Sequence, residues 1–270
     1  MKLYPALDVC ATSADALLAM VDDFSPSALE ERETAMRLFF VSADARDAAC
    51  AELRARGFDT APLEVSDEDW ARRSQDNLVP ITVGRITVVP KTELRSGAAH
   101  DSPIVIVIPP SMGFGTGHHA TTRLCLEALQ RVDVSGRTVL DVGTGSGILA
   151  IAADRLGAAH VTGIDVDPDA IQAARENLDH NPDVDRVQFD VRDLSAHPLP
   201  QADVVTANLT GAMLVGSVSV LSAAVRPGGS LILSGILAEE REHVLDAFGR
   251  DSIAWEKHDG EWIGFVVTKR

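Results

Sequence analysis

The second half of the chain alternates regularly between two hydrophobic periods. Short apolar runs from residue 138 onward predict strands at residues 138–142, 160–165, 186–190, 202–207 and 230–235. Apolar residues spaced three and four apart predict helices between them, at residues 147–156, 168–178, 212–225 and 239–248. This alternation is typical of a parallel sheet with helices on both faces. Two last strands are expected at residues 253–258 and 262–268, and the Asp259-Gly260 turn joining them means that one runs antiparallel to the rest.

The first hundred residues follow another order of elements. Strands are expected at residues 3–9, 27–33, 36–41 and 61–65, and helices at residues 12–24 and 45–56. The resulting β-α-β-β-α-β order is that of the ferredoxin-like α+β unit. We therefore predict a small ferredoxin-like domain at residues 1–65 and a linker at residues 66–100, with a helix at 66–77 and a strand at 81–89. A large α/β domain follows at residues 101–270, beginning with a strand at 104–108.

Composition and charge narrow the function classes. The 270 residues are 46% hydrophobic, enough to bury a real core, and no apolar run approaches the roughly 20 residues of a membrane-spanning helix. Forty acidic residues against 24 basic ones give a net charge of −16, which disfavours direct binding to nucleic acid and suits a basic partner. The start of the chain does not resemble a secretory signal, and three cysteines at unpaired spacings indicate neither disulfides nor a zinc site. A cytoplasmic protein without membrane contact is expected, and the oligomeric state is left open.

A glycine-rich loop carries the clearest chemical signal. The strand at 138–142 runs directly into Gly143, Gly145 and Gly147, where the backbone must turn sharply and leave room for a ligand. Asp165 ends the next strand, 22 residues after Gly143, which is where a carboxylate meets the hydroxyls of a bound ribose. Two enzyme classes share this arrangement. The dinucleotide fingerprint of dehydrogenases requires glycine at position 148, which is isoleucine here, so dehydrogenase is the second interpretation.

The segment D-V-G-T-G-S-G that begins at Asp141 resembles motif I of class I S-adenosylmethionine-dependent methyltransferases. This resemblance implies a Rossmann-like seven-stranded sheet closed by an antiparallel hairpin, with S-adenosylmethionine as the cofactor. It also implies that Gly143 and Gly145 line the methionine end of the cofactor and that Asp165 holds its ribose. Asp193, shortly after the third strand, is either close to the adenine amino group or a solvated loop residue.

A second segment makes the resemblance more specific. FGTGHHATT, from Phe114 to Thr122, is similar to the FGTG-x-H-x-TT signature of the PrmA family, which methylates the large-subunit ribosomal protein L11. The resemblance implies cofactor contacts for Thr122 and Phe114, in a glycine-rich loop that could close as a lid. ADVVTANLT places Asn208 at the carboxyl end of the fourth strand, the edge where ligands bind in open α/β sheets. Asn208 resembles the motif IV asparagine of amino-group methyltransferases, which implies contact with the cofactor and orientation of the amine as the catalytic residue.

The resemblance covers nearly the whole chain and implies that the N-terminal unit recognises the substrate. This chain departs from the family pattern at His118, at Ala120 in place of a proline, and at Ser74 in place of a tryptophan. His118 and His119 have no second ligand cluster, so no metal site is expected.

The expected activity is methylation of lysine amines of L11, with the N-terminal amine as a further target. A lysine methyltransferase of another protein, such as an electron-transfer flavoprotein subunit, is the nearer alternative. A non-catalytic S-adenosylmethionine-binding module in ribosome assembly is the farther one.

Overall fold

The computed structural model describes residues 3–10, 17, 20–21, 24, 26–31, 35–66, 79–90, 104–109, 119–194 and 198–269. The chain divides into two compact units, Met1–Asp76 and Asn77–Arg270. Among the described residues, no helix combines the length and the apolar character that a membrane crossing requires.

The N-terminal unit is built on a four-stranded sheet with the order β2-β3-β1-β4, in which every neighbouring pair is antiparallel. Its strands are β1 (Leu3–Val9), β2 (Pro26–Glu31), β3 (Met36–Phe40) and β4 (Thr60–Ser66). Helix α2 (Ala43–Ala55) packs Leu53 against Leu7 and Leu38 of the sheet. The helix expected at residues 12–24 falls largely outside the described residues, so the ferredoxin-like assignment stays a prediction.

A small three-stranded sheet with the order β5-β6-β7 lies in the second unit. The segment predicted as one strand at 81–89 forms two, β5 (Ile81–Val83) and β6 (Ile86–Val89), because Gly84 turns the backbone with φ +57°. Strand β6 pairs in parallel with β7 (Ile104–Val107), although the sequence assigned residues 81–89 to the linker. The buried Asn181 side chain accepts from the Val107 N–H at 3.0 Å and donates to the Val107 carbonyl at 2.8 Å, which fixes this sheet to the unit. The helix expected at 66–77 lies almost entirely outside the described residues.

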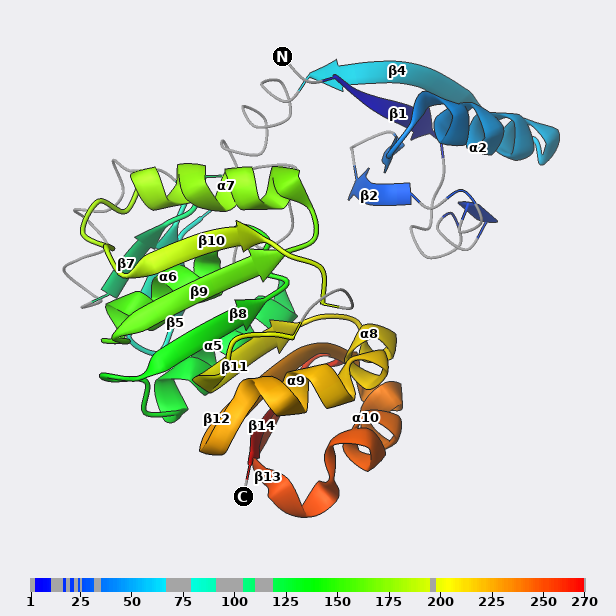
Figure 1. Cartoon of the computed structure of the whole chain (residues 1–270). Helices are drawn as coiled ribbons and strands as arrows, with labels where there is room; N and C mark the ends of the chain where they lie inside the picture. Colours follow the sequence, from blue (N-terminus) through cyan, green and yellow to red (C-terminus); the bar gives the residue numbers. More distant parts are fainter. Residues whose placement is uncertain are drawn as a thin grey trace. The chain divides into compact units, whose positions relative to one another are not determined.

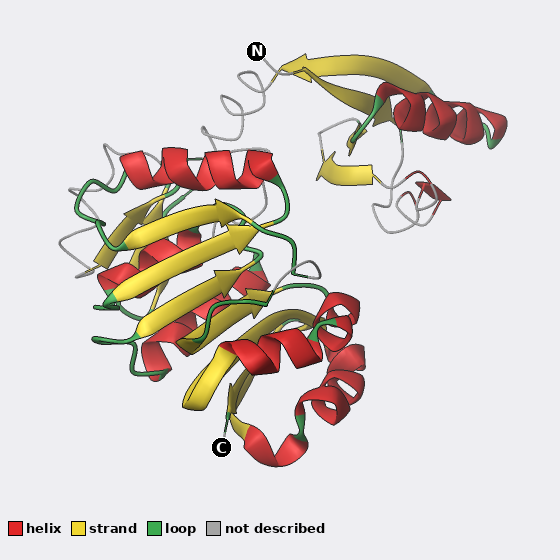
Figure 2. Cartoon of the chain, viewed as in Figure 1, coloured by secondary structure: helices red, strands yellow, loops and turns green. Residues whose placement is uncertain are grey.

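The large sheet has seven strands in the order β10-β9-β8-β11-β12-β14-β13 (Figures 1 and 2). In chain order these strands are β8 (Thr138–Val142), β9 (His160–Asp165), β10 (Val187–Val191), β11 (Ala202–Asn208), β12 (Val225–Leu237), β13 (Ile253–Asp259) and β14 (Trp262–Thr268). The first five positions in the sheet are parallel, while β14 runs antiparallel to both of its neighbours. The predicted class I fold with a closing antiparallel hairpin is therefore confirmed.

Two hydrophobic cores lie on the two faces of this sheet. Along β8, Val139 belongs to one core while Leu140 and Val142 belong to the other, as the two-residue period of a strand requires. The first core is closed by helices α5 (Ala120–Arg131), α6 (Ile148–Arg155) and α7 (Pro168–Asp179). The second is closed by helices α8 (Gly211–Gly216), α9 (Val218–Ala224) and α10 (Arg241–Phe248).

Three further elements of the second unit differ clearly from the sequence expectation. The helix predicted at 212–225 is two short helices, α8 and α9, because the backbone leaves helical geometry at Ser217, directly after Gly216, a weak helix former. Strand β12 begins at Val225 instead of residue 230. The helix predicted from residue 239 begins with a short 3₁₀ helix, Ala238–Glu240, before α10.

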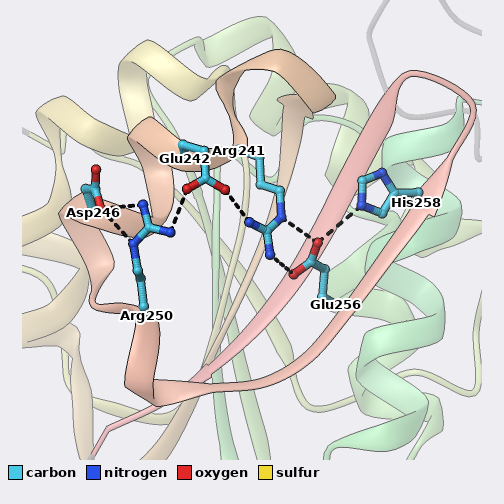
Figure 3. Close-up of polar contacts among 6 residues, drawn as sticks. All are labelled: Arg241, Glu242, Asp246, Arg250, Glu256 and His258. Atoms are coloured by element: carbon cyan, nitrogen blue, oxygen red, sulfur yellow. Dashed lines mark hydrogen bonds and ion pairs between the residues drawn. The ribbon is translucent and has the colours of Figure 1, made fainter.

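A charged network joins α10 to β13, the strand at the sheet edge (Figure 3). Arg241 donates two hydrogen bonds to Glu256, at 2.8 and 2.7 Å, and this guanidinium holds the pKa of Glu256 below its usual range. Glu256 also contacts His258 at 3.2 Å, and Arg250 joins Glu242 on the other side. Charged side chains at an edge strand discourage pairing with another chain, and this structural role is enough to explain the network.

Candidate functional site

Three of the predicted residues lie where adjacent parallel strands end. Strand β8 lies between β9 and β11, and Val142 is in register with Ile164 on one side and Ala207 on the other. Gly143, Asp165 and Asn208 directly follow these three paired residues, so all three lie at one edge of the sheet. This is the edge where open α/β sheets bind ligands.

The loop after β8 turns through three left-handed glycines. Gly143, Gly145 and Gly147 have φ of +68°, +52° and +78°, a region that side chains with a Cβ rarely adopt. The loop is also crowded, because a Cβ on Gly143 would lie 2.5 Å from Leu209 Cδ2. Within the loop, the Gly147 N–H donates to the Thr144 carbonyl at 2.9 Å, and α6 begins directly after it.

Two carboxylates hold this loop. Asp165 accepts from the Gly145 N–H at 3.0 Å on one oxygen and from the Asp167 N–H at 3.1 Å on the other. Each oxygen keeps a lone pair that can accept a further hydrogen bond. Asp141 lies beneath the loop, and Thr144 donates its hydroxyl to the Asp141 carboxylate at 2.6 Å. The loop is thus bound to the ends of both β8 and β9.

Asn208 is positioned by the strand beside it. Its neighbour Leu209 donates its N–H to the Ser234 carbonyl of β12 at 3.0 Å. Gly235 follows with φ +86°, and a Cβ there would lie 2.3 Å from the Leu209 carbonyl oxygen. The Asn208 side chain is partly exposed, and its amide makes no hydrogen bond within the described part of the chain. It is therefore available to a ligand.

Helix α5 brings Thr122 into the interior next to the sheet. Thr122 is 1% exposed, and its hydroxyl has no hydrogen-bond partner among the described residues. A buried hydroxyl without a partner is unusual and is often explained by a ligand or a water that completes it. Phe114, predicted to act with Thr122, lies outside the described residues, as does His118.

The start of α5 is attached to the closing hairpin. His119 caps the helix and packs edge-on against Trp262, with ring centroids 4.9 Å apart. Arg123 donates to Asp259 at 2.7 and 2.9 Å. Burial, and to a smaller extent the charge of Arg123, lower the pKa of His119. These contacts fix the start of α5 against β13 and β14.

Sequence reasoning missed two apolar side chains beside Asp165. Val166, directly after β9, is 64% exposed, and Val191, paired with Asp165 at the end of β10, is 52% exposed. Exposed apolar side chains at a ligand-binding edge suit the flat face of a base. An apolar residue directly after the strand-ending acid was the available signal. Asp193 is exposed in the loop after β10, so its relation to an adenine amino group stays a prediction.

The site chemistry matches a nucleoside ligand. Among the described residues, no group of three histidine, cysteine, aspartate or glutamate side chains is close enough to hold a metal ion. Asp165 can accept from ribose hydroxyls, the glycine loop admits a close ligand, and Thr122 has an unused hydroxyl.

The seven-stranded sheet with its antiparallel β14, and the glycine loop after β8, define a class I S-adenosylmethionine-dependent methyltransferase. A family model described as ribosomal protein L11 methyltransferase (PrmA) matches residues 14–270. This chain belongs to the PrmA family.

Similar proteins agree with the family. The ribosomal protein L11 methyltransferase of Burkholderia thailandensis is 41% identical over 214 residues, covering 77% of this chain and 67% of that protein. The one of Burkholderia multivorans is 40% identical over 225 residues, covering 79% and 71%. The crystal structure of ribosomal protein L11 methylase from Lactobacillus delbrueckii subsp. bulgaricus has a TM-score of 0.64 and 29% identity, covering 72% of this chain and 99% of that chain.

We predict that Gly235→Ala destabilises the protein more than Gly136→Ala. Both glycines are left-handed, at φ +86° and +69°, but only Gly235 has a backbone atom, the Leu209 carbonyl oxygen, in the way of a Cβ. Both variants should lose about 1 kcal/mol of unfolding free energy from the backbone, and Gly235→Ala about 1–3 kcal/mol more from overpacking. Chemical denaturation of the two variants measures the difference. Equal losses of unfolding free energy in the two variants would show that the close approach of the Leu209 backbone does not require glycine at position 235.

Proposed function

We propose that this chain transfers methyl groups from S-adenosylmethionine to amines of ribosomal protein L11, at lysine side chains and at the N-terminal amine. The observation that carries the proposal is the match of the L11 methyltransferase family over residues 14–270. The relatives reported above are named for the same activity. No observation favours the electron-transfer flavoprotein subunit, the non-catalytic module or a nicotinamide coenzyme. The cytoplasm, where ribosomal proteins are made, is the proposed location.

The residues at the strand ends fit the cofactor. Gly143 and Gly145 line its methionine end, because their left-handed backbone leaves no Cβ between the ligand and the main chain. Asp165 accepts from the ribose hydroxyls through the lone pairs that its two N–H donors leave over. The Thr122 hydroxyl, which has no hydrogen-bond partner among the described residues, gains one when the cofactor binds. Phe114 covers the cofactor next to Thr122. Val166 and Val191 supply apolar contact for the base.

Asn208 orients the amine that is methylated. When bound, the cofactor supplies a methyl group on a sulfonium, already a strong electrophile, so the protein mainly aligns the acceptor and excludes water. The acceptor nitrogen must be neutral, although an ordinary lysine has a pKa of about 10.4. The Asn208 carbonyl accepts a hydrogen bond from the neutral amine, and its free amide suits this role. Apolar burial next to a cation lowers the pKa of the lysine in the required direction.

The charge of the protein suits a basic substrate. A net charge of −16 attracts a lysine-rich protein and accelerates its encounter, more so at low salt. The same charge disfavours direct contact with nucleic acid, so free L11 is the proposed substrate.

Radiolabelled S-adenosylmethionine and purified L11 test the activity. We expect label on L11, located on lysine and on the N-terminal amine by mass spectrometry. Absence of label on L11, while calorimetry shows that the donor binds, would exclude L11 as the substrate and leave the methyltransferase class intact. A tightly bound nicotinamide coenzyme with no binding of the methyl donor would contradict the whole proposal.

Asp165→Ala should weaken cofactor binding about 10- to 100-fold. It removes a charged hydrogen-bond acceptor, worth about 1.5–3 kcal/mol, and also releases the Gly145 N–H. Isothermal titration calorimetry measures the dissociation constant. Asp185→Ala, an exposed carboxylate just before β10, is the matched control and should bind as the unmodified protein does. Unchanged affinity in Asp165→Ala would refute the ribose assignment.

Asn208→Ala should lower kcat about 100-fold, because a misplaced acceptor loses alignment with the methyl group. Gln201→Ala is the control: residue 201 directly precedes β11 and is exposed, and its side-chain amide donates a hydrogen bond to the Ala223 carbonyl. Steady-state kinetics on L11 separates kcat from KM for each variant. An unchanged kcat in Asn208→Ala would remove Asn208 from the catalytic step.

A further inference from the structure

Asp141 is a buried carboxylate directly beneath the glycine loop. It is the second-last residue of β8, the strand between β9 and β11, and only 1% of its surface is exposed. A charge at such a position costs free energy unless other groups compensate for the lost water. The groups around Asp141 therefore indicate in which form it is held.

The hydrogen bonds around Asp141 fit its ionised form. Thr144 donates to one carboxylate oxygen at 2.6 Å, and Thr206 donates to the other at 2.5 Å. Each hydroxyl carries a single proton, so both can donate only while both Asp141 oxygens accept. Protonation of Asp141 turns one of its oxygens into a hydroxyl, which is a weaker acceptor for Thr144 or Thr206. Since Thr144 belongs to the glycine loop, the charge of Asp141 and the shape of the loop are linked.

No positive side chain balances this charge within the described residues. The ionisable groups whose charges reach Asp141 are Asp165 on β9 and Cys125 on α5, and neither is a cation. Helix α6 contributes a hydrogen bond from the Ala150 backbone, and β11 contributes only Thr206. Burial, as the largest cause, raises the pKa of Asp141 to about 6, while the two threonine hydroxyls oppose that rise. Burial also raises the pKa of the Cys125 thiol, which stays neutral.

We propose that Asp141 is a positioning residue that acts as the buried countercharge for the sulfonium of the methyl donor. The proposal rests on the function proposed above. The methyl donor and its product S-adenosylhomocysteine share the adenine, the ribose and the amino-acid end, but only the donor carries a positive charge on sulfur. A carboxylate beneath the loop, with hydrogen-bond donors but no cation to balance its charge among the described residues, therefore favours the donor over the product. Asp141 distinguishes the donor from the product through its charge and through its hydrogen bond with Thr144, and it does not contact the reacting atoms.

This role has a definite pH dependence. Binding a cation nearby lowers the pKa of Asp141, so donor binding releases protons at a pH near the free value of about 6. Above pH 7 the carboxylate is ionised and the preference for the donor is complete. As the pH falls through about 6, Asp141 becomes protonated in the free protein and the preference falls. Each unit by which the donor lowers this pKa corresponds to about a tenfold loss in the affinity ratio.

Isothermal titration calorimetry with S-adenosylmethionine and S-adenosylhomocysteine between pH 5 and 8 tests the proposal. We expect the donor-to-product affinity ratio to fall about tenfold between pH 8 and pH 5. The same titrations at pH 6, in buffers of different ionisation enthalpy, should show proton release for the donor and much less for the product. Asp141→Asn should remove both effects. Asp203→Asn is the matched control, because that carboxyl, at the start of β11, has its pKa lowered to about 2 by Thr138 and does not titrate in this range.

The outcomes separate this proposal from the function on which it rests. If neither ligand binds, the proposed function fails and the countercharge fails with it. If both bind with a ratio that does not change with pH, and without differential proton release, only the countercharge is wrong. A pH-dependent ratio that persists in a folded Asp141→Asn variant would assign the effect to another group, such as His119. The buffer measurement needs no variant, so a failure of Asp141→Asn to fold does not prevent a decision.

Discussion

The structure depends on one constraint: three parallel strands must end together while the chain between β8 and α6 turns through left-handed glycines. The loop has few side chains of its own that could stabilise it. Carboxylates at the strand ends stabilise it instead by accepting hydrogen bonds from it. Asp165 binds the Gly145 N–H, and Asp141 binds the Thr144 hydroxyl. A ligand-binding surface made mostly of backbone is thereby given a fixed shape before any ligand arrives, which reduces the ordering that binding requires.

Much of this arrangement was predictable from sequence, for identifiable reasons. Buried parallel strands are continuous apolar runs, so β8 and β9 have the boundaries that the sequence predicted. A strand that ends at a glycine loop fixes the edge where the loop lies, and the register then brings Asp165 and Asn208 to the same edge. The Asp259-Gly260 turn predicted that one of the last two strands runs antiparallel to the rest, because strands joined by a tight hairpin run in opposite directions. The structure shows that this strand is β14.

What the sequence did not predict depends on contacts between distant residues. The Asp141–Thr206 hydrogen bond joins positions 65 apart, and neither residue type signals it. The turn at Gly84 had a local cause, but β6 joins the second unit through its pairing with β7, across a segment without a clear pattern. The break between α8 and α9 follows a single glycine within an otherwise helical period. The roles of Phe114, Thr122 and Asn208 came from resemblance to a family, and the geometry of Thr122 and Asn208 alone would admit other ligands.

Different features of the chain indicate its fold and its substrate. A glycine loop, a strand-ending carboxylate and an asparagine at the neighbouring strand can position a methyl donor for many acceptors, because in the proposed mechanism these groups contact the part of the reaction common to all of them. Discrimination among protein substrates must therefore come from surfaces beyond the strand ends. The family match begins at residue 14 and so includes the N-terminal unit together with the methyltransferase fold. The family match over these residues connects the chain to L11. The residues at the strand ends carry the proposed methyl transfer, which would be the same for any amine.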